Sequence, residues 1–352
     1  MNRRPPRNGE KIAKIQNTLL VDGNFLFKTG FFASKDSYNI RGEHIGGISA
    51  FLYMLRKLLM DDMYHRVYVF WDGNFSGKMR YEIYKPYKSS RGKDYENGTQ
   101  PIDESELQQR KMIWDYLNEL NIRQLKHEII EGDDFIAYYC LTKKENEKIT
   151  ICTNDRDMCQ LISEDVRIYF LDLKNYVGKS NFNEYFCYHK ENAALVKIMT
   201  GDSSDCIKGI KGLGVKTLLT NFPEIAERKM TVEEIVEKAK LLQEEKKKIK
   251  KPLKVLDNII NRVTEGVQGT RIYEINELLV NLKKPMMTDD AIEDLETLID
   301  TPLETSERDI KNVLRYMERD GMDKIIGDYR YADYLTPFNK LKEREKNNFL
   351  NK

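Results

Sequence analysis

The fold of this chain is predicted from the stretch Thr18-Leu19-Leu20-Val21-Asp22-Gly23-Asn24 near its amino terminus. The run up to Val21 is short and mostly apolar, which is typical of a buried strand, and Gly23 permits a sharp turn out of it. The same pattern recurs at Val67-Tyr68-Val69-Phe70-Trp71, which is followed by Asp72-Gly73-Asn74. Each of these predicted strands therefore ends on a carboxylate.

Strands and helices alternate outward from this stretch. Gly46–Met60 has apolar residues at helical spacing and predicts an amphipathic helix. Further strands are predicted at Ile122–Ile130, Lys148–Thr153 and Val166–Leu171. Such alternation indicates an α/β fold with a mostly parallel central sheet flanked by helices.

Acidic residues stand at the predicted strand ends and helix starts. They are Asp22, Asp72, Glu131, Asp133, Asp134, Asp155, Asp157, Asp202 and Asp205. In a parallel sheet, ligands bind beyond the carboxyl ends of the strands, so the acids at strand ends should converge on one edge. A pair of Mg²⁺ ions, about 4 Å apart, needs such a cluster of carboxylates to clamp a phosphodiester. Any one of these acids alone is more often a cap or a surface residue, but the set favours a metal-dependent phosphodiesterase.

Residues 76–120 interrupt the pattern of the sheet. Lys78–Lys93 (KMRYEIYKPYKSSRGK) contains six Lys or Arg and one Glu, with three tyrosines between them. Basic side chains bind phosphates and aromatic rings can stack on bases, which favours nucleic-acid contact over a merely solvated helix face.

The stretch Gly201–Thr217 (GDSSDCIKGIKGLGVKT) combines acidic and basic residues. Its two carboxylates suit a divalent cation, whereas its glycines and Lys216 suit a phosphate backbone. Beyond it the sequence is helical and charged, and Lys246–Lys254 (KKKIKKPLK) either touches DNA or is a solvated surface between helices.

Composition indicates a globular protein without membrane spans or a signal peptide. Hydrophobic residues are 40% and charged residues 33%, with no apolar run long enough to cross a bilayer. The five cysteines contain no Cys-x-x-Cys pair, so we expect reduced thiols and an intracellular, cytoplasmic location. Since the net charge is only +1, any DNA-binding charge must be gathered in patches.

We expect a disordered basic arm at 1–11, a nuclease core at 12–190 and a helical DNA-binding region at 191–352.

The motifs, taken in order, resemble the flap endonuclease and 5′-3′ exonuclease family, most closely its bacteriophage and bacterial polymerase-associated branch. They are Asp-Gly-Asn, Asp-Gly, Glu-Gly-Asp-Asp, Thr-Asn-Asp-Arg-Asp-Met-Cys-Gln-Leu and Gly-Asp-Ser-Ser-Asp followed by Gly-Ile-Lys-Gly-Leu-Gly-Val-Lys-Thr. The resemblance covers about residues 18–220. It implies a PIN/5′-nuclease-like core with a helical arch at about 76–120 and a helix-hairpin-helix element at about 201–220.

The resemblance also implies a division of the acids between two metal ions. The tighter site would be formed by Asp22, Asp72, Glu131 and Asp133, with Asp134 alongside. The second ion would be held or hydrated by Asp155, Asp157, Asp202 and Asp205. The implied cofactors are two Mg²⁺ ions, for which Mn²⁺ can substitute.

The implied DNA contacts come from the arch base and the glycine loop. Lys88 would stabilise the scissile phosphate with the help of Arg80, and Tyr87 and Arg91 complete the basic pattern at the arch base. The duplex would be gripped by the residues Gly209, Gly212, Gly214, Lys216 and Thr217, whose loop carbonyls could also hold K⁺. Lys208 departs from the family pattern, which usually has proline there.

The expected function is that of a structure-specific 5′ nuclease in replication or repair, acting as 5′-3′ exonuclease and flap endonuclease. The expected partners are DNA with a 5′ flap or 5′ end, RNA-primed DNA as an RNA/DNA hybrid, and replication proteins; the protein is expected to be a monomer. A non-catalytic branched-DNA-binding protein and a PIN-type ribonuclease are the alternatives. A haloacid-dehalogenase-like phosphatase would need Asp-x-Asp at the first strand, whereas Asp22 is followed by Gly23-Asn24.

Overall fold

The computed structural model describes residues 15–99, 102–303, 308–322 and 331–349 of the chain. The basic arm expected at 1–11 lies outside these residues. Among the helices of the described residues, none combines the length and the apolar composition that a membrane span requires.

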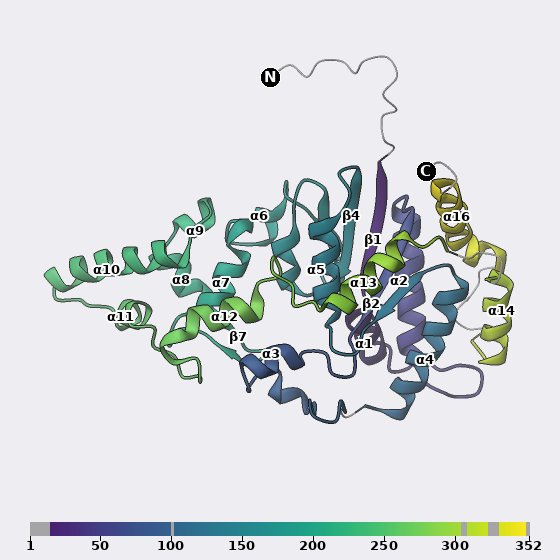
Figure 1. Ribbon diagram of the computed structural model, residues 1–352, viewed down its shortest axis with the longest axis horizontal. Helices are drawn as coiled ribbons and strands as arrows, with labels where there is room; N and C mark the ends of the chain where they lie inside the picture. The colour runs from purple at the N-terminus through teal and green to yellow at the C-terminus, as the bar shows by residue number, and fades with distance from the viewer. Residues whose placement is uncertain (1–14, 100–101, 304–307, 323–330, 350–352) are drawn as a thin grey trace, which may run out of the picture.

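A six-stranded sheet forms the centre of the molecule, with the strand order β3-β2-β1-β4-β5-β6 (Figure 1). The strands are β1 (Gln16–Asp22), β2 (Arg66–Trp71), β3 (Arg123–Lys126), β4 (Glu147–Thr153), β5 (Val166–Phe170) and β6 (Asn175–Val177). Neighbouring strands are parallel except for β6, which runs antiparallel to β5. The predicted α/β fold with a mostly parallel sheet is confirmed.

Strand β3 is shorter than the strand predicted at Ile122–Ile130. Its expected second half leaves the ladder because it supports the turn that follows β2. The carbonyl of Glu128 accepts a hydrogen bond from the Phe75 N–H at 2.8 Å, and the carbonyl of Ile130 accepts one from the Gly73 N–H at 3.3 Å.

Side chains alternate between the two faces of the sheet, and each face has its own layer of helices. Leu19 and Val21 pack with α1 (Gly23–Ala33), α2 (Gly46–Asp61) and α4 (Glu104–Glu119). Leu20 points to the other face and packs with α5 (Gly132–Thr142), the 3-10 helix η2 (Arg156–Leu161) and α13 (Asp289–Asp300). Since the strands are buried on both faces, only the strand ends remain for chemistry.

A helical lobe with a separate core projects from one side of the sheet (Figure 1). It contains α7 (Ala193–Thr200), the β-ribbon of β7 (Gly201–Asp202) and β8 (Ile207–Lys208), α8 (Val215–Asn221), α9 (Glu224–Glu227), α10 (Val232–Lys248), α11 (Lys254–Ile260), η4 (Gly269–Arg271) and α12 (Ile272–Val280). The connecting segments are α3 (Lys78–Ile83), η1 (Ser89–Arg91), α6 (Phe182–Tyr185) and η3 (Lys190–Asn192).

The carboxyl-terminal helices return to the sheet instead of extending this lobe. α14 (Ile310–Arg319) packs beside α4, and α16 (Tyr331–Phe349) packs beside α2. The Tyr116 hydroxyl donates to Asp320 at 2.7 Å, and Arg123 pairs with Glu345 at 2.7 Å. The region 191–352, expected to be one helical DNA-binding region, thus includes the lobe at 193–280 and two helices that pack beside α4 and α2.

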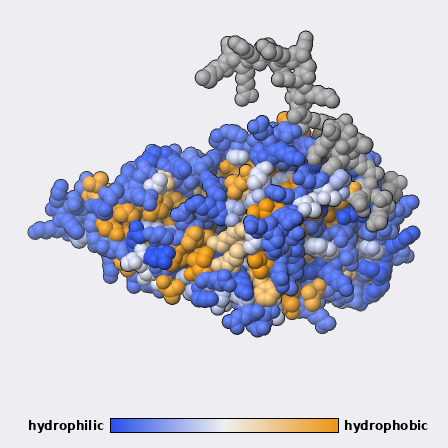
Figure 2. Space-filling view, in the orientation of Figure 1, coloured by the Kyte–Doolittle hydropathy of each residue, from blue (hydrophilic) through white to orange (hydrophobic). Residues whose placement is uncertain are grey.

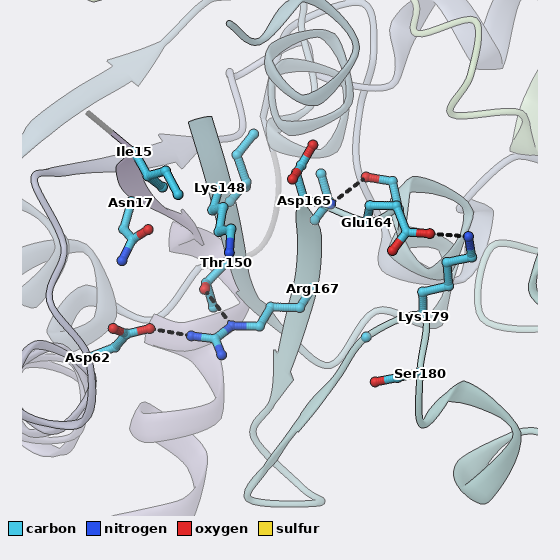
Figure 3. A pocket seen from close by; sticks show the side chains of 14 residues that line it. Ile15, Asn17, Asp62, Lys148, Thr150, Glu164, Asp165, Arg167, Lys179 and Ser180 are labelled. Atoms are coloured by element: carbon cyan, nitrogen blue, oxygen red, sulfur yellow. Dashed lines mark hydrogen bonds and ion pairs between the residues drawn. The ribbon is translucent and has the colours of Figure 1, made fainter. Parts of the chain in front are cut away.

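A cavity of about 500 Å³ opens at the amino-terminal edge of the sheet (Figure 3). Four of its charged side chains form two ion pairs, Arg167 with Asp62 and Lys179 with Glu164. This edge is opposite to the one that carries Asp22, so the cavity is not the predicted metal centre.

Candidate active site

The carboxyl ends of β1 and β2 place two acids at one edge of the sheet. Asp22 ends β1 and caps α1, where it accepts hydrogen bonds from the Phe25 N–H at 3.0 Å and the Thr153 hydroxyl at 3.1 Å. Asp72 follows β2 and accepts from the Gly132 N–H at 2.8 Å. These bonds join β1, β2, β4 and the start of α5 at the edge predicted from the sequence.

The acids of this edge lie close enough to repel one another. Burial, with the charges of Asp72 and Asp155, raises the pKa of Asp22 to about 7. Burial and the charges of Asp22 and Asp155 raise the pKa of Asp133, in the first turn of α5, well above its usual value. A divalent cation would relieve this repulsion, and carboxylate oxygens are the ligands that Mg²⁺ prefers. The donor set therefore fits the implied ions.

Glu131 is the acid at this edge that is held by cations of the protein. It lies before α5 and contacts the ammonium of Lys88, the guanidinium of Arg80 at 2.5 Å and the hydroxyl of Tyr87 at 3.1 Å. Burial raises its pKa, but the charges of Lys88 and Arg80 outweigh this effect and lower the pKa to about 2. Glu131 is therefore an anion that is paired with two cations of the protein.

Arg80 and Asp134 form a buried pair behind Glu131. The guanidinium contacts the two carboxylate oxygens of Asp134 at 2.6 and 2.8 Å, and Asp134 also accepts from the Met286 N–H at 3.0 Å. Asp134 is 0% exposed and Arg80 5%. The expectation placed Asp134 alongside the tighter metal site and had Arg80 assist Lys88. In the structure Asp134 and Arg80 pair with each other, and Arg80 also contacts Glu131.

Replacing Arg80 with Met is expected to destabilise the fold. The substitution leaves Asp134 as a buried anion without a cation, and breaking such a pair costs about 3–5 kcal/mol. Urea unfolding measures the change. Arg91→Met is the matched control because Arg91, 51% exposed, pairs with Asp205 at the surface, where loss of a pair costs at most about 1 kcal/mol. Equal stability of the two variants would contradict the assignment of Arg80 as a structural residue.

The second group of acids is gathered by Lys197, a residue that the sequence analysis missed. Its ammonium contacts both Asp157, at 2.5 Å, and Asp202. Burial and the charge of Asp155 raise the pKa of Asp157 to about 7. Burial also raises the pKa of Asp202, but Lys197 outweighs it and lowers the value to about 2. A signal was present, since Lys197 is the single charged residue of the apolar helix Ala193–Thr200.

Protein cations thus lie among the carboxylates of both groups. Within the described ranges, no three acidic, His or Cys side chains are already arranged to cage one ion. The ammonium of Lys88 contacts Glu131, and that of Lys197 contacts Asp157 and Asp202, so the two lysines occupy carboxylate oxygens of both groups. Binding of a divalent ion would require these lysines to move aside.

The segment Tyr87–Arg91, expected to be the base of a helical arch, contacts Asp205 of the second group of acids. Lys88 has a positive φ of 49° and donates its backbone N–H to the Asp205 carbonyl at 2.9 Å, while Arg91 pairs with the Asp205 side chain at 2.7 Å. Tyr87, expected to contact nucleic acid, is 2% exposed. Its ring is unavailable for stacking in this conformation, and its hydroxyl contacts Glu131 instead.

The glycine loop forms a tight hairpin between α7 and α8. Gly209 passes so close to α7 that an added Cβ would lie 2.1 Å from the carbonyl carbon of Thr200, and Gly212 has a φ of +79°. Gly214 precedes α8, where Lys216 is exposed and Thr217 half-buried. The loop therefore presents backbone and a lysine to the outside.

Side chains from residues 258–276 brace the carbonyls of this hairpin. Thr264 donates to the carbonyl of Gly209 at 3.0 Å, and Asn258 to that of Lys211 at 2.8 Å. Asn276 donates to the carbonyl of Lys208 at 2.9 Å. These carbonyls already have protein donors, so K⁺ would have to share them or use others. The bracing also supplies rigidity at Lys208, the position where the resemblance led us to expect proline.

The family model described as "5′-3′ exonuclease, N-terminal resolvase-like domain" matches residues 17–192. A 5′-3′ exonuclease of Mycoplasmopsis pulmonis is 28% identical over 217 residues, which cover 60% of this chain and 69% of the relative. The thermostable DNA polymerase I of Thermus thermophilus is 30% identical over 207 residues. That match covers 58% of this chain but only 24% of the polymerase.

Solved structures share the fold. One is the bacteriophage T5 flap endonuclease in a pseudo-enzyme-product complex with DNA and metal ions. It matches with a TM-score of 0.54 and 17% identity, over 86% of this chain and 100% of the phage protein. The match extends well beyond residue 192, so it includes part of the helical lobe as well as the sheet.

Proposed function

Because the chain belongs to the family of 5′-3′ exonucleases with an N-terminal resolvase-like domain, we propose that it is a structure-specific 5′ nuclease. It hydrolyses DNA phosphodiesters near the junction between a duplex and a 5′ single strand, as 5′-3′ exonuclease and flap endonuclease. The observation that carries this proposal is the position of Lys88, whose ammonium lies on Glu131 at the acidic edge and whose backbone is joined to the Asp205 loop.

Two groups of acids would hold two Mg²⁺ ions, for which Mn²⁺ can substitute. The first group is Asp22, Asp72, Glu131 and Asp133, and the second is Asp155, Asp157, Asp202 and Asp205. When bound, the ions supply a hydroxide nucleophile and neutralise charge on the phosphate. Asp134 and Arg80 keep the first group in place from behind. Lys197 links Asp157 with Asp202 and orders the second group before metal arrives.

Lys88 acts on the phosphate directly. Burial lowers its pKa, but Glu131, Tyr87 and Asp205 outweigh burial and raise the pKa well above its usual value. Lys88 therefore carries a positive charge and acts electrostatically. The ammonium of Lys88 would move from Glu131 to the scissile phosphate. It would exchange one anionic partner for another, so its positive charge would stay paired.

The hairpin fixes the duplex relative to the acids. Its backbone and Lys216 would contact the phosphates of one strand, with K⁺ as a bridging ion at the loop. Asp202 and Asp205 belong to the ribbon that leads into this hairpin. The residues that would contact the duplex and the second group of acids are therefore parts of one segment. The distance between them sets where the cut falls. We place the activity in cytoplasmic replication or repair, with RNA-primed DNA and replication proteins as further partners.

A comparison of substrates tests the proposal. A 5′-labelled flap, a nicked duplex and an RNA-primed duplex are incubated with the protein in Mg²⁺ and in EDTA. We expect cleavage of the flap near the junction, with 5′-phosphate ends, and no product in EDTA. Tight binding of the flap without product in Mg²⁺ or Mn²⁺ would instead favour a non-catalytic branched-DNA-binding protein, and cleavage of RNA alone would favour a PIN-type ribonuclease.

A further inference from the structure

The outermost part of the helical lobe is a two-helix arm formed by α10 and α11 (Figure 1). Its tip, residues 246–254, contains six lysines and no acidic residue, in a chain whose net charge is only +1. Lys247, Lys248, Lys250 and Lys251 are exposed. In Figure 2 the extreme end of this projection is hydrophilic on the face shown, and hydrophobic residues gather nearer the body of the molecule.

The lysines of the tip have no acidic partner among the described residues. The ion pairs of α10 lie nearer its start and its middle, where Lys238 contacts Glu224 and Lys240 contacts Glu237. The helix dipole explains only part of the cluster, because it favours cations in the last turn of α10. It does not explain Lys254, which begins α11, where a cation is disfavoured.

Hydrogen bonds cap the start of α10 and join its last turns to the segment before α11. Thr231 and Glu234 form a capping box at the start of α10. At the tip, the side chain of Gln243, 1% exposed, donates to the carbonyl of Leu253 at 3.2 Å and accepts from its N–H at 3.0 Å. Because the buried side chain of Gln243 joins the end of α10 to the residue before α11, the tip is carried on two connected helices and not on a loose loop.

The arm is also fastened to the glycine hairpin. Asn258, in α11, donates to the carbonyl of Lys211, and the N–H of Lys211 donates to the carbonyl of Val263 at 2.9 Å. The Tyr273 hydroxyl donates to the carbonyl of Ile259 at 2.9 Å. A duplex gripped by the hairpin would therefore have the lysine tip at a fixed distance from it.

We propose that this lysine tip is a second contact for the phosphate backbone, on duplex that lies beyond the glycine hairpin. The inference rests on the proposed function, since it needs a gripped duplex. The 17 residues of α10 span ~26 Å, or about 8 base pairs of duplex. The tip thus selects substrates whose duplex is long enough to reach it, and it does so through charge alone, without reading sequence.

Salt dependence of binding tests this inference. The full chain and a variant with Lys247→Gln, Lys248→Gln and Lys251→Gln are compared by fluorescence anisotropy with labelled 5′-flap DNA, in Ca²⁺ to prevent cleavage. One flap has duplex arms of about 6 base pairs, closed by a loop and shorter than the span from the hairpin to the tip, and another has arms of about 25 base pairs. The control variant carries Lys148→Gln, Lys311→Gln and Lys340→Gln, three exposed lysines on the body of the molecule. Lys250, whose φ is 56°, is left unchanged to avoid altering the turn.

We assume that each of the three replaced lysines contacts one phosphate. On the flap with long arms, the slope of log Kd against log salt concentration should then be smaller by about 2.7 in the tip variant than in the full chain. A fourfold rise in salt would then weaken the full chain about 40-fold more than the variant. On short arms the two proteins should bind alike, and the control variant should behave as the full chain.

Two results would overturn the inference: an unchanged slope on long arms, or an equal loss on short and long arms. Cleavage of a saturating flap in Mg²⁺ keeps the two proposals apart. The tip variant should cut at the rate of the full chain, whereas a full chain that fails to cut would defeat the proposed function whatever the slopes show.

Discussion

Replacing Lys88 with Ala is expected to lower kcat on a 5′-flap substrate by roughly 10²- to 10³-fold, the usual effect of losing one preorganised charge at a reacting phosphate. The Kd for the uncut flap should stay nearly unchanged, because we propose that the glycine hairpin, and not Lys88, holds the duplex. The fold should also survive, since Glu131 retains Arg80 and Tyr87 as partners. Single-turnover cleavage and anisotropy measure the two quantities separately.

Lys85→Ala is the matched control for this experiment. Lys85 lies three residues earlier and is exposed over the ring of Tyr81. Its loss should leave kcat within a factor of a few. If the Kd of the Lys88→Ala variant rose in step with the fall in rate, Lys88 would be a docking residue and its assignment to the scissile phosphate would be wrong.

Replacing Asp155 with Asn should abolish most cleavage while sparing binding. Asp155 lies beyond the end of β4, near enough to Asp22 and Asp157 that its charge raises the pKa of both. Loss of about 4 kcal/mol of metal-dependent charge stabilisation corresponds to ~10³-fold in rate. The fold should be retained because Asn can still accept the hydrogen bond that Asp155 takes from the Asp157 N–H at 2.7 Å.

The control for this variant is Asp172→Asn. Asp172 lies after β5, and its half-exposed carboxylate pairs with Arg156 at the surface instead of with Lys88 or Lys197. Cleavage in Mg²⁺ should be unchanged by this substitution. An Asp155→Asn protein that cut at the normal rate would remove Asp155 from the metal site.

The sequence predicted the sheet and the acidic edge because both depend on local patterns. The short apolar run before Asp22 forms a strand of a parallel sheet, and every such strand delivers its last residue to the same edge. The glycine hairpin was predictable for a similar reason, since Gly209 and Gly212 stand where close approach and a positive φ require glycine.

The pairing of side chains was not predictable, because it joins residues far apart in the chain. Arg80 meets Asp134 across 54 positions and the carbonyl of Leu279 across 199 positions. Tyr87 occurs in a basic run that suggests an exposed face, yet it packs inward on Glu131. The return of α14 and α16 to the sheet depends on contacts such as Arg123 with Glu345, which no local pattern indicates.

The central claim is that the acidic edge is a two-metal site for cutting a 5′ flap. The most direct test is the initial rate of cleavage of a 5′-labelled flap by the full chain, measured while Mg²⁺ is raised from zero in EDTA-treated buffer. We predict no product without Mg²⁺, a cooperative rise in rate with its concentration, and a single main cut near the junction. Product formed in EDTA, or no product at any concentration of Mg²⁺ or Mn²⁺, would contradict the account.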